Sequence, residues 1–203
     1  LAPGLWRWTG RHEEWKQDVG CVYYEHGADV CLIDPLLPPE DPDRFWAALD
    51  RDVARAGGDV HVLLTVFWHA RSAAELVARY GASLWAPSRA KAAVERRAGT
   101  VTKPFHAGAL LPAGIKPFAS GRSTEVVFWL PEDRALVTGD VILGDAGGEL
   151  RLCPESWLPA GTGHPELRRA LRPLLELDVE QVVVSHGESV LEGGAEALRV
   201  LLR

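Results

Sequence analysis

The stretch LPEDRALVTGD, from Leu130 to Asp140, gives the clearest structural signal in the sequence. Two apolar, β-rich runs, 125–130 and 134–138, flank the segment Pro131-Glu132-Asp133, whose residues favour a tight turn. The pattern predicts a β-hairpin with Asp140 just after its second strand. A carboxylate in that place is either a turn residue that bonds its own backbone or a functional group at the end of a strand.

Two other predicted strands are followed directly by polar residues. The segment VVVSHG, 182–187, places His186 after a buried apolar strand. The segment HVLLT, 61–65, belongs to a nearly continuous apolar run, which is typical of a strand covered on both faces. The residues VFWHARS, 66–72, come next, and they include a histidine and an arginine. These strand ends are therefore candidate positions for a functional site.

The rest of the chain mixes strand and helix patterns. A hairpin is predicted over 20–25 and 29–34. Apolar residues at helical spacing predict helices over 41–56, 72–80 and 164–177. This mixture favours two mixed sheets with helices outside them over a simple doubly wound sheet.

Composition and charge narrow the class of protein. With 203 residues, of which 47% are hydrophobic and 25% charged, the chain is expected to form one domain over 1–203. A net charge of −6 argues against a nucleic-acid partner, because such binding needs clustered Lys and Arg. The apolar runs are far shorter than the ~20 residues that span a bilayer. The opening residues lack the pattern of a secretory signal, so we expect a cytoplasmic protein with no membrane partner.

Taken together, the hairpin ending in Thr138-Gly139-Asp140, the strand ending in His186-Gly187, and the strand 61–65 with its following loop and helix resemble the metallo-β-lactamase superfamily. These landmarks span nearly the whole chain, and their order and spacing match the family. The resemblance implies a four-layer αββα sandwich, α+β or α/β in class, built as a minimal single domain. It also implies a site between the sheets, where metal ions acidify water and polarise a scissile carbonyl or phosphoryl group.

Two metal ligands of the family have a clear match in this chain. Asp140 matches the aspartate that bridges the two metals, and His186 matches the final histidine. At the position of the histidine that precedes the hairpin, the segment 120–123 contains Arg122 and no imidazole. The resemblance therefore implies a site that has lost several ligands.

The remaining ligands belong to the family's His-x-His-x-Asp-His motif, which follows the strand 61–65. A direct count places Val66 and Trp68 on the two histidines, and Ala70 and Arg71 on the Asp-His pair. A count shifted by one places His69 on the second histidine and Arg71 on the aspartate. Either register leaves at least four of the usual ligands absent.

The first hypothesis is a hydrolase-like protein with an eroded metal site and a pocket suited to a small anionic or polar ester substrate. A histidine would act as general base, and arginines would stabilise negative charge. The predicted catalytic residues are His69, Asp140 and His186, and the predicted substrate-binding residues are Trp68, Arg71 and Arg122.

Two alternatives stay open, and the sequence does not decide whether the chain is an enzyme. One is a non-catalytic descendant of the fold that binds a ligand or partner. The other is a single-zinc hydrolase, because three protein ligands plus water suffice for a catalytic zinc site. We expect no bound cofactor; if a metal is bound, its ligands are Asp140, His186 and His69, and zinc is the candidate ion. A small molecule is the expected partner, and a homodimer is left open.

Overall fold

The computed structural model describes residues 1–99 and 103–203. The chain divides into two compact units, and each is described here by itself. Unit 1 comprises Leu1–Phe105 and Pro112–Gly114, and unit 2 comprises His106–Leu111 and Ile115–Arg203. The expectation of one domain over 1–203 stays a prediction.

Unit 1 is built on a six-stranded sheet with the order β1-β2-β3-β4-β5-β6. The first three strands pair antiparallel, and β3 through β6 pair parallel. The strands are β1 Leu5–His12, β2 Gln17–His26, β3 Asp29–Ile33, β4 Val60–Leu63, β5 Ser83–Pro87 and β6 Lys103–Phe105. This sheet contains the 20–25 and 29–34 hairpin expected from the sequence.

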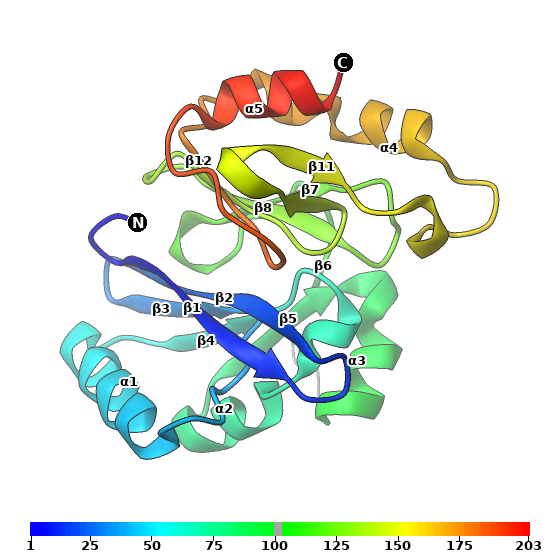
Figure 1. The fold of residues 1–203 in the computed structure, drawn as a ribbon. Coiled ribbons are helices and arrows are strands. Elements are labelled where there is room, and N and C mark those ends of the chain that lie inside the picture. Colours follow the sequence, from blue (N-terminus) through cyan, green and yellow to red (C-terminus); the bar gives the residue numbers. More distant parts are fainter. Residues whose placement is uncertain (100–102) are drawn as a thin grey trace. The chain divides into compact units, whose positions relative to one another are not determined.

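Three helices of unit 1, α1 Pro42–Ala56, α2 Ala73–Tyr80 and α3 Lys91–Ala98, pack against this sheet (Figure 1). Helix α1 begins where the Asp41 side chain accepts the amide of Arg44, and it ends at Gly57 in the left-handed conformation. Leu49 of α1 joins one hydrophobic cluster with residues of α2, α3, β3 and β4. The helices thus cover an apolar face that would otherwise meet water.

The parallel pairing of β3 and β4 brings their carboxyl ends to one edge of the sheet. Asp34 directly follows β3, and Thr65 lies two residues after β4. A single 3-10 turn, η1 Phe67–Ala70, comes next and carries His69. Residues distant in sequence therefore meet at this edge.

Unit 2 contains a four-stranded sheet with the order β12-β9-β8-β7 and a separate hairpin formed by β10 and β11. The strands are β7 Lys116–Ala119, β8 Val126–Leu130, β9 Ala135–Val137, β10 Ile142–Gly144, β11 Leu150–Leu152 and β12 Gln181–Val183. Because β12 and β9 are parallel neighbours, the loops after both strands begin at the same edge. Asp140 lies on one of these loops and His186 on the other.

Helices α4 His164–Leu171 and α5 Gly194–Leu201 cover the sheet of unit 2 (Figure 1). Both contribute leucines to one buried cluster with β8, β9 and β12. The expected helix 164–177 ends early as an α-helix and continues as the 3-10 segment η6 Arg172–Glu176, because Pro173 cannot supply a backbone N–H. The other 3-10 segments are η2 Ser88–Ala90, η3 Pro112–Gly114, η4 Ala146–Gly148 and η5 Glu155–Trp157.

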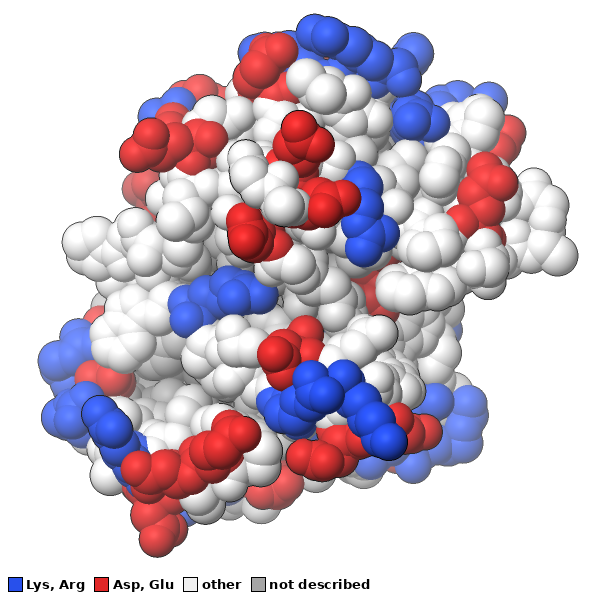
Figure 2. Space-filling model, in the orientation of Figure 1, with Lys and Arg blue, Asp and Glu red and all other residues white. Residues whose placement is uncertain are grey.

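Charged side chains of both signs are interspersed on the face drawn in Figure 2. This mixture agrees with a chain that carries 22 basic and 28 acidic residues. Among the described residues, no helix is long and apolar enough to cross a membrane.

Candidate functional site

In unit 1 a buried histidine is held by an aspartate. His69 is completely buried, and its Nδ1 lies 2.9 Å from a carboxylate oxygen of Asp34. The same carboxylate accepts the backbone N–H of Thr65 at 2.8 Å and, in a short hydrogen bond, the Thr65 hydroxyl. Because an ionised carboxylate only accepts, Nδ1 of His69 carries the proton. In the neutral ring the lone pair is then on Nε2, which is the atom able to bind a metal.

The backbone around this pair is unusual. Asp34 has φ 50°, a left-handed conformation that Asp tolerates. Arg71, which ends η1, has φ 26° and ψ −111°, a conformation rare for a side chain of this size. Nη1 of Arg71 donates to the carbonyl oxygen of Asp34 at 3.1 Å. Such outliers cluster at functional sites, where the surrounding structure maintains them.

The other predicted residue of unit 1 is Trp68. It is half-buried, and its ring meets the ring of His69 edge-on, with 6.4 Å between the centroids. The 3-10 turn thus carries Trp68 and His69, and Arg71 follows directly. Their predicted roles, catalysis for His69 and substrate binding for the other two, stay predictions.

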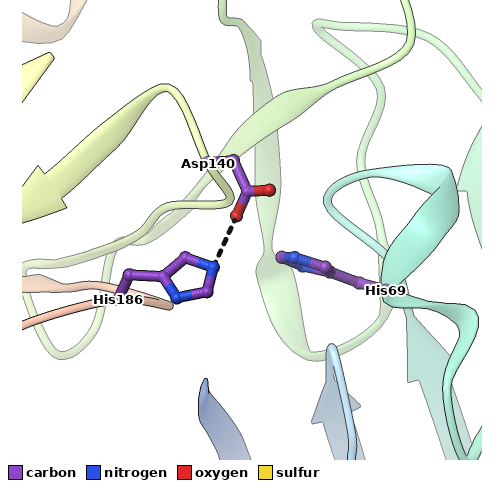
Figure 3. Close-up of side chains that lie close together, drawn as sticks. All are labelled: His69, Asp140 and His186. Carbon is purple, nitrogen blue, oxygen red and sulfur yellow. Dashed lines mark ion pairs between the residues drawn. The ribbon is translucent and has the colours of Figure 1, made fainter. Parts of the chain in front are cut away.

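In unit 2 the two residues that match family ligands come together. The Nε2 atom of His186 lies 3.3 Å from Oδ1 of Asp140, and Figure 3 shows this ion pair as a dashed line. Asp140 is 5% exposed, and His186 is half-buried. His69, drawn in the same figure, extends from η1. The parallel β9–β12 pair therefore places a carboxylate and an imidazole side by side.

Glu125, which the sequence interpretation missed, holds the backbone of the loop at Asp140. One carboxylate oxygen of Glu125 accepts the backbone N–H groups of Asp140 at 2.6 Å and of Val141 at 2.8 Å. Its side chain is completely buried. Burial, together with the nearby charge of Asp140, raises the pKa of Glu125 above its ordinary value, whereas Arg122 and the two amides lower it and favour the ionised form.

The second oxygen of Glu125 forms an ion pair with Arg122, with 2.6 Å between Oε2 and Nη1. Nη2 of Arg122 donates to the carbonyl oxygen of Trp157 at 2.8 Å. Arg122 is therefore a buried structural partner of Glu125, and its expected contact with substrate stays a prediction. No local sequence pattern marks Glu125 as part of the site.

The loop that carries His186 is held against β10 by its backbone. The amide of Gly144 donates to the carbonyl oxygen of His186 at 2.9 Å. Gly187 has φ 85°, and a Cβ atom at this position would lie 2.1 Å from the Gly144 carbonyl oxygen. Only glycine fits such a conformation and approach, so the sequence His186-Gly187 fixes the loop locally.

The chain was compared with protein families, curated sequences and solved structures. No family model and no curated protein sequence matches the chain. Solved structures do match: the DIM-1 metallo-β-lactamase aligns with TM-score 0.73 at 14% identity, covering 100% of this chain and 94% of that one. The chain has the metallo-β-lactamase fold.

Two further solved structures with the metallo-β-lactamase fold also align with nearly the whole chain. A metallo-β-lactamase from Pontibacter korlensis aligns with TM-score 0.72 at 17% identity, covering 100% of this chain and 96% of that one. A metallo-β-lactamase family protein from Thermus thermophilus aligns with TM-score 0.63 at 18% identity, covering 98% of this chain and 79% of that one. These likenesses confirm the fold expected from the sequence, and the function has to be argued from the residues themselves.

Proposed function

We propose that this chain is a hydrolase that holds a single zinc ion with His69, Asp140 and His186. The observation that carries the proposal is the Asp34–His69 hydrogen bond, because it leaves Nε2 of His69 as the metal-binding atom. Two imidazoles and one carboxylate, each offering one ligand atom, are a donor set that catalytic zinc sites use. Three protein ligands leave a coordination position open for water or substrate.

The surroundings of each ligand support this assignment. Histidines that bind metals usually donate their other ring N–H to a carboxylate, which orients the ring and makes it a stronger ligand. Asp34 provides that partner, and Thr65 anchors Asp34 in turn. In unit 2 the loops after β9 and β12 bring Asp140 and His186 within 3.3 Å of each other.

One protein with the same fold has been solved with a single zinc ion. The FIM-1 metallo-β-lactamase from Pseudomonas aeruginosa, in its mono-zinc form, has TM-score 0.70 to this chain at 12% identity, covering 100% of this chain and 92% of that one. By the resemblance, the segment 120–123 falls at one further ligand position of the family, and the guanidinium of its Arg122 is paired with Glu125. A guanidinium cannot serve as a metal ligand because it has no lone pair to offer.

A bound zinc ion would polarise a carbonyl or phosphoryl oxygen and make water more acidic. The chain's own residues would orient and bind the reactants. With zinc bound, Asp140 and His186 would hold the ion through a carboxylate oxygen and a ring nitrogen. Without zinc, their facing atoms, Oδ1 and Nε2, would hold or accept a proton. Arg71 and Trp68 would favour a small substrate with a negative or polar ester group and an apolar portion.

Metal analysis tests the proposal and separates it from the metal-free alternative expected from the sequence. Protein purified without a chelating tag is dialysed with zinc, and the bound metal is measured. We expect about one equivalent. We also expect its loss in His69→Ala, Asp140→Ala and His186→Ala, and its retention in a control, His106→Ala, in which an exposed histidine is replaced.

Activity is then measured on panels of esters, thioesters, lactones and phosphodiesters, with and without a chelator. Turnover that a chelator abolishes and zinc restores would support the single-zinc hydrolase. Turnover without metal would replace it with a metal-free hydrolase that depends on Asp140 and His186. Absence of both metal and turnover would leave the non-catalytic binding protein.

A further inference from the structure

We infer that Glu125 is a positioning residue that fixes the direction of the Asp140 side chain, with Arg122 as its charge partner. The inference rests on the proposed function, because positioning matters to the extent that Asp140 is a ligand. Its structural part is independent of any metal. It assigns a role in the site to a residue that no sequence motif marks.

Within the loop that carries Asp140, Glu125 accepts hydrogen bonds from backbone amides and not from a side chain. A single oxygen, Oε1, accepts two consecutive amides, those of Asp140 and Val141, at 2.6 and 2.8 Å. Two adjacent N–H groups held by one acceptor restrict the peptide planes on both sides of the Asp140 Cα atom. The direction of the Asp140 Cα–Cβ bond, and with it the approach to His186, is fixed in the same way.

Three donors converge on this carboxylate, which explains why a neutral side chain would not replace it. Besides the two amides, Arg122 donates from Nη1 at 2.6 Å to the other oxygen. An ionised carboxylate can accept all three bonds, whereas the NH₂ group of a glutamine would face either the guanidinium or the amides. Arg122 in turn balances a charge that is costly to bury alone.

The position of Arg122 links this pair to the metal site. By the resemblance described above, it stands where the family has a histidine ligand before the hairpin. In this chain the tight turn from Arg122 to Glu125, closed by a 3.0 Å backbone hydrogen bond, directs both side chains into the interior of unit 2. In this chain the residue at that position is paired with Glu125, which in turn holds the loop that carries Asp140.

The competing explanation is that Glu125 only stabilises the fold. A pair of double variants distinguishes this role from the positioning of Asp140. In an Arg122→Met background, which removes the buried cation, Glu125→Gln retains an acceptor oxygen for the two amides. Glu125→Leu in the same background fills similar space without any acceptor. A merely structural role predicts that both double variants have the same zinc affinity once they reach similar melting temperatures.

Two readouts are measured on each variant. Hydrogen exchange followed by NMR on metal-free protein reports protection of the Asp140 and Val141 amides. Competition with a chromophoric chelator reports zinc affinity. If Glu125 positions Asp140, the Leu variant loses protection at these two amides and binds zinc about tenfold to a hundredfold more weakly than the Gln variant. Equal protection and equal affinity in the two variants would overturn the inference.

A third variant keeps the inference testable if the Leu double variant does not fold. Glu125→Asp preserves the charge for Arg122 but shortens the side chain by one methylene, so the amides should lose their acceptor and zinc affinity should fall. Glu196→Gln, in an exposed pair with Arg199, is the matched control and should change neither readout. If the parent binds no zinc, the proposed function fails, and unchanged amide protection in Glu125→Asp would overturn the positioning role separately.

Discussion

The Asp34→Asn variant would test the hydrogen-bond network around His69. Asp34 has φ 50°, and asparagine tolerates this left-handed conformation as well as aspartate does. The substitution therefore removes the negative charge and one acceptor while adding little backbone strain. Its effect reports on the hydrogen bonds of the side chain.

The expected size of the effect follows from the three donors that meet the carboxylate: the Thr65 amide, the Thr65 hydroxyl and Nδ1 of His69. A hydrogen bond to a charged group contributes about 1.5–3 kcal/mol, and a buried donor left unpaired costs about 1–3 kcal/mol. If nothing relaxes, the loss in the free energy of unfolding is about 3–5 kcal/mol. His69 can relax by moving its proton to Nε2 and accepting the asparagine NH₂ at Nδ1, which lowers the loss to about 2 kcal/mol.

Urea unfolding at pH 7 measures the stability, and ¹⁵N chemical shifts of the histidine rings identify the tautomer. We expect a loss of at least about 2 kcal/mol, a His69 ring protonated at Nε2, and weaker zinc binding. The control is Asp29→Asn, since that carboxylate is 41% exposed and lies 3.9 Å from His61; it should cost less than about 0.5 kcal/mol. An Asp34→Asn protein as stable as the parent, with His69 still protonated at Nδ1, would refute the reasoning.

Three further predictions use other parts of the chain. Gly187→Ala should lower the free energy of unfolding by at least about 2 kcal/mol, because the added Cβ would clash with the Gly144 carbonyl oxygen. Gly147→Ala is the control: the space there is open, so the loss in thermal unfolding should be about 1 kcal/mol. Burial raises the pKa of the Cys21 thiol to about 11, so native protein should resist iodoacetamide at pH 8 and react after unfolding; rapid native alkylation would contradict this. The Arg79 guanidinium and the Tyr80 hydroxyl lower the pKa of Asp50 from 3.8 to about 2, so Asp50 stabilises the fold above pH 4 and loses this effect as the pH falls to 2. The urea midpoints of Asp50→Asn and the parent should therefore differ slightly at pH 7 and converge near pH 2.

Local patterns predicted much of the fold. The hairpin of β8 and β9 and helix α1 were expected from turn residues, caps and periodicity, and the structure contains both. The strand β1 and the β10–β11 hairpin were missed. Strand β1 pairs with β2 along its full length, but its tryptophans, exposed Trp6 and half-buried Trp8, hide the usual alternation. The strands β10 and β11 have three residues each, too few for a period to appear.

The candidate site was harder to predict because it depends on tertiary contacts. The sequence left two registers open for His69, and the 3-10 turn η1 turns its ring toward Asp34, which is 35 residues earlier in the chain. The family resemblance singled out Asp140 and His186. Periodicity alone does not predict which strands are neighbours, so it could not show that β9 and β12 pair. Glu125 escaped notice because its burial and its bonds to a loop 15 residues away have no local signature.

The buried pair of Arg122 and Glu125 also constrains how this chain could change over evolutionary time. Replacing Arg122 with histidine would leave the carboxylate of Glu125 inside unit 2 without its cation, and breaking a buried pair in this way costs about 3–5 kcal/mol. The free energy of unfolding of a typical domain is only about 5–15 kcal/mol. A single substitution at Arg122 would therefore produce a poorly folded intermediate, so the two positions can change only together.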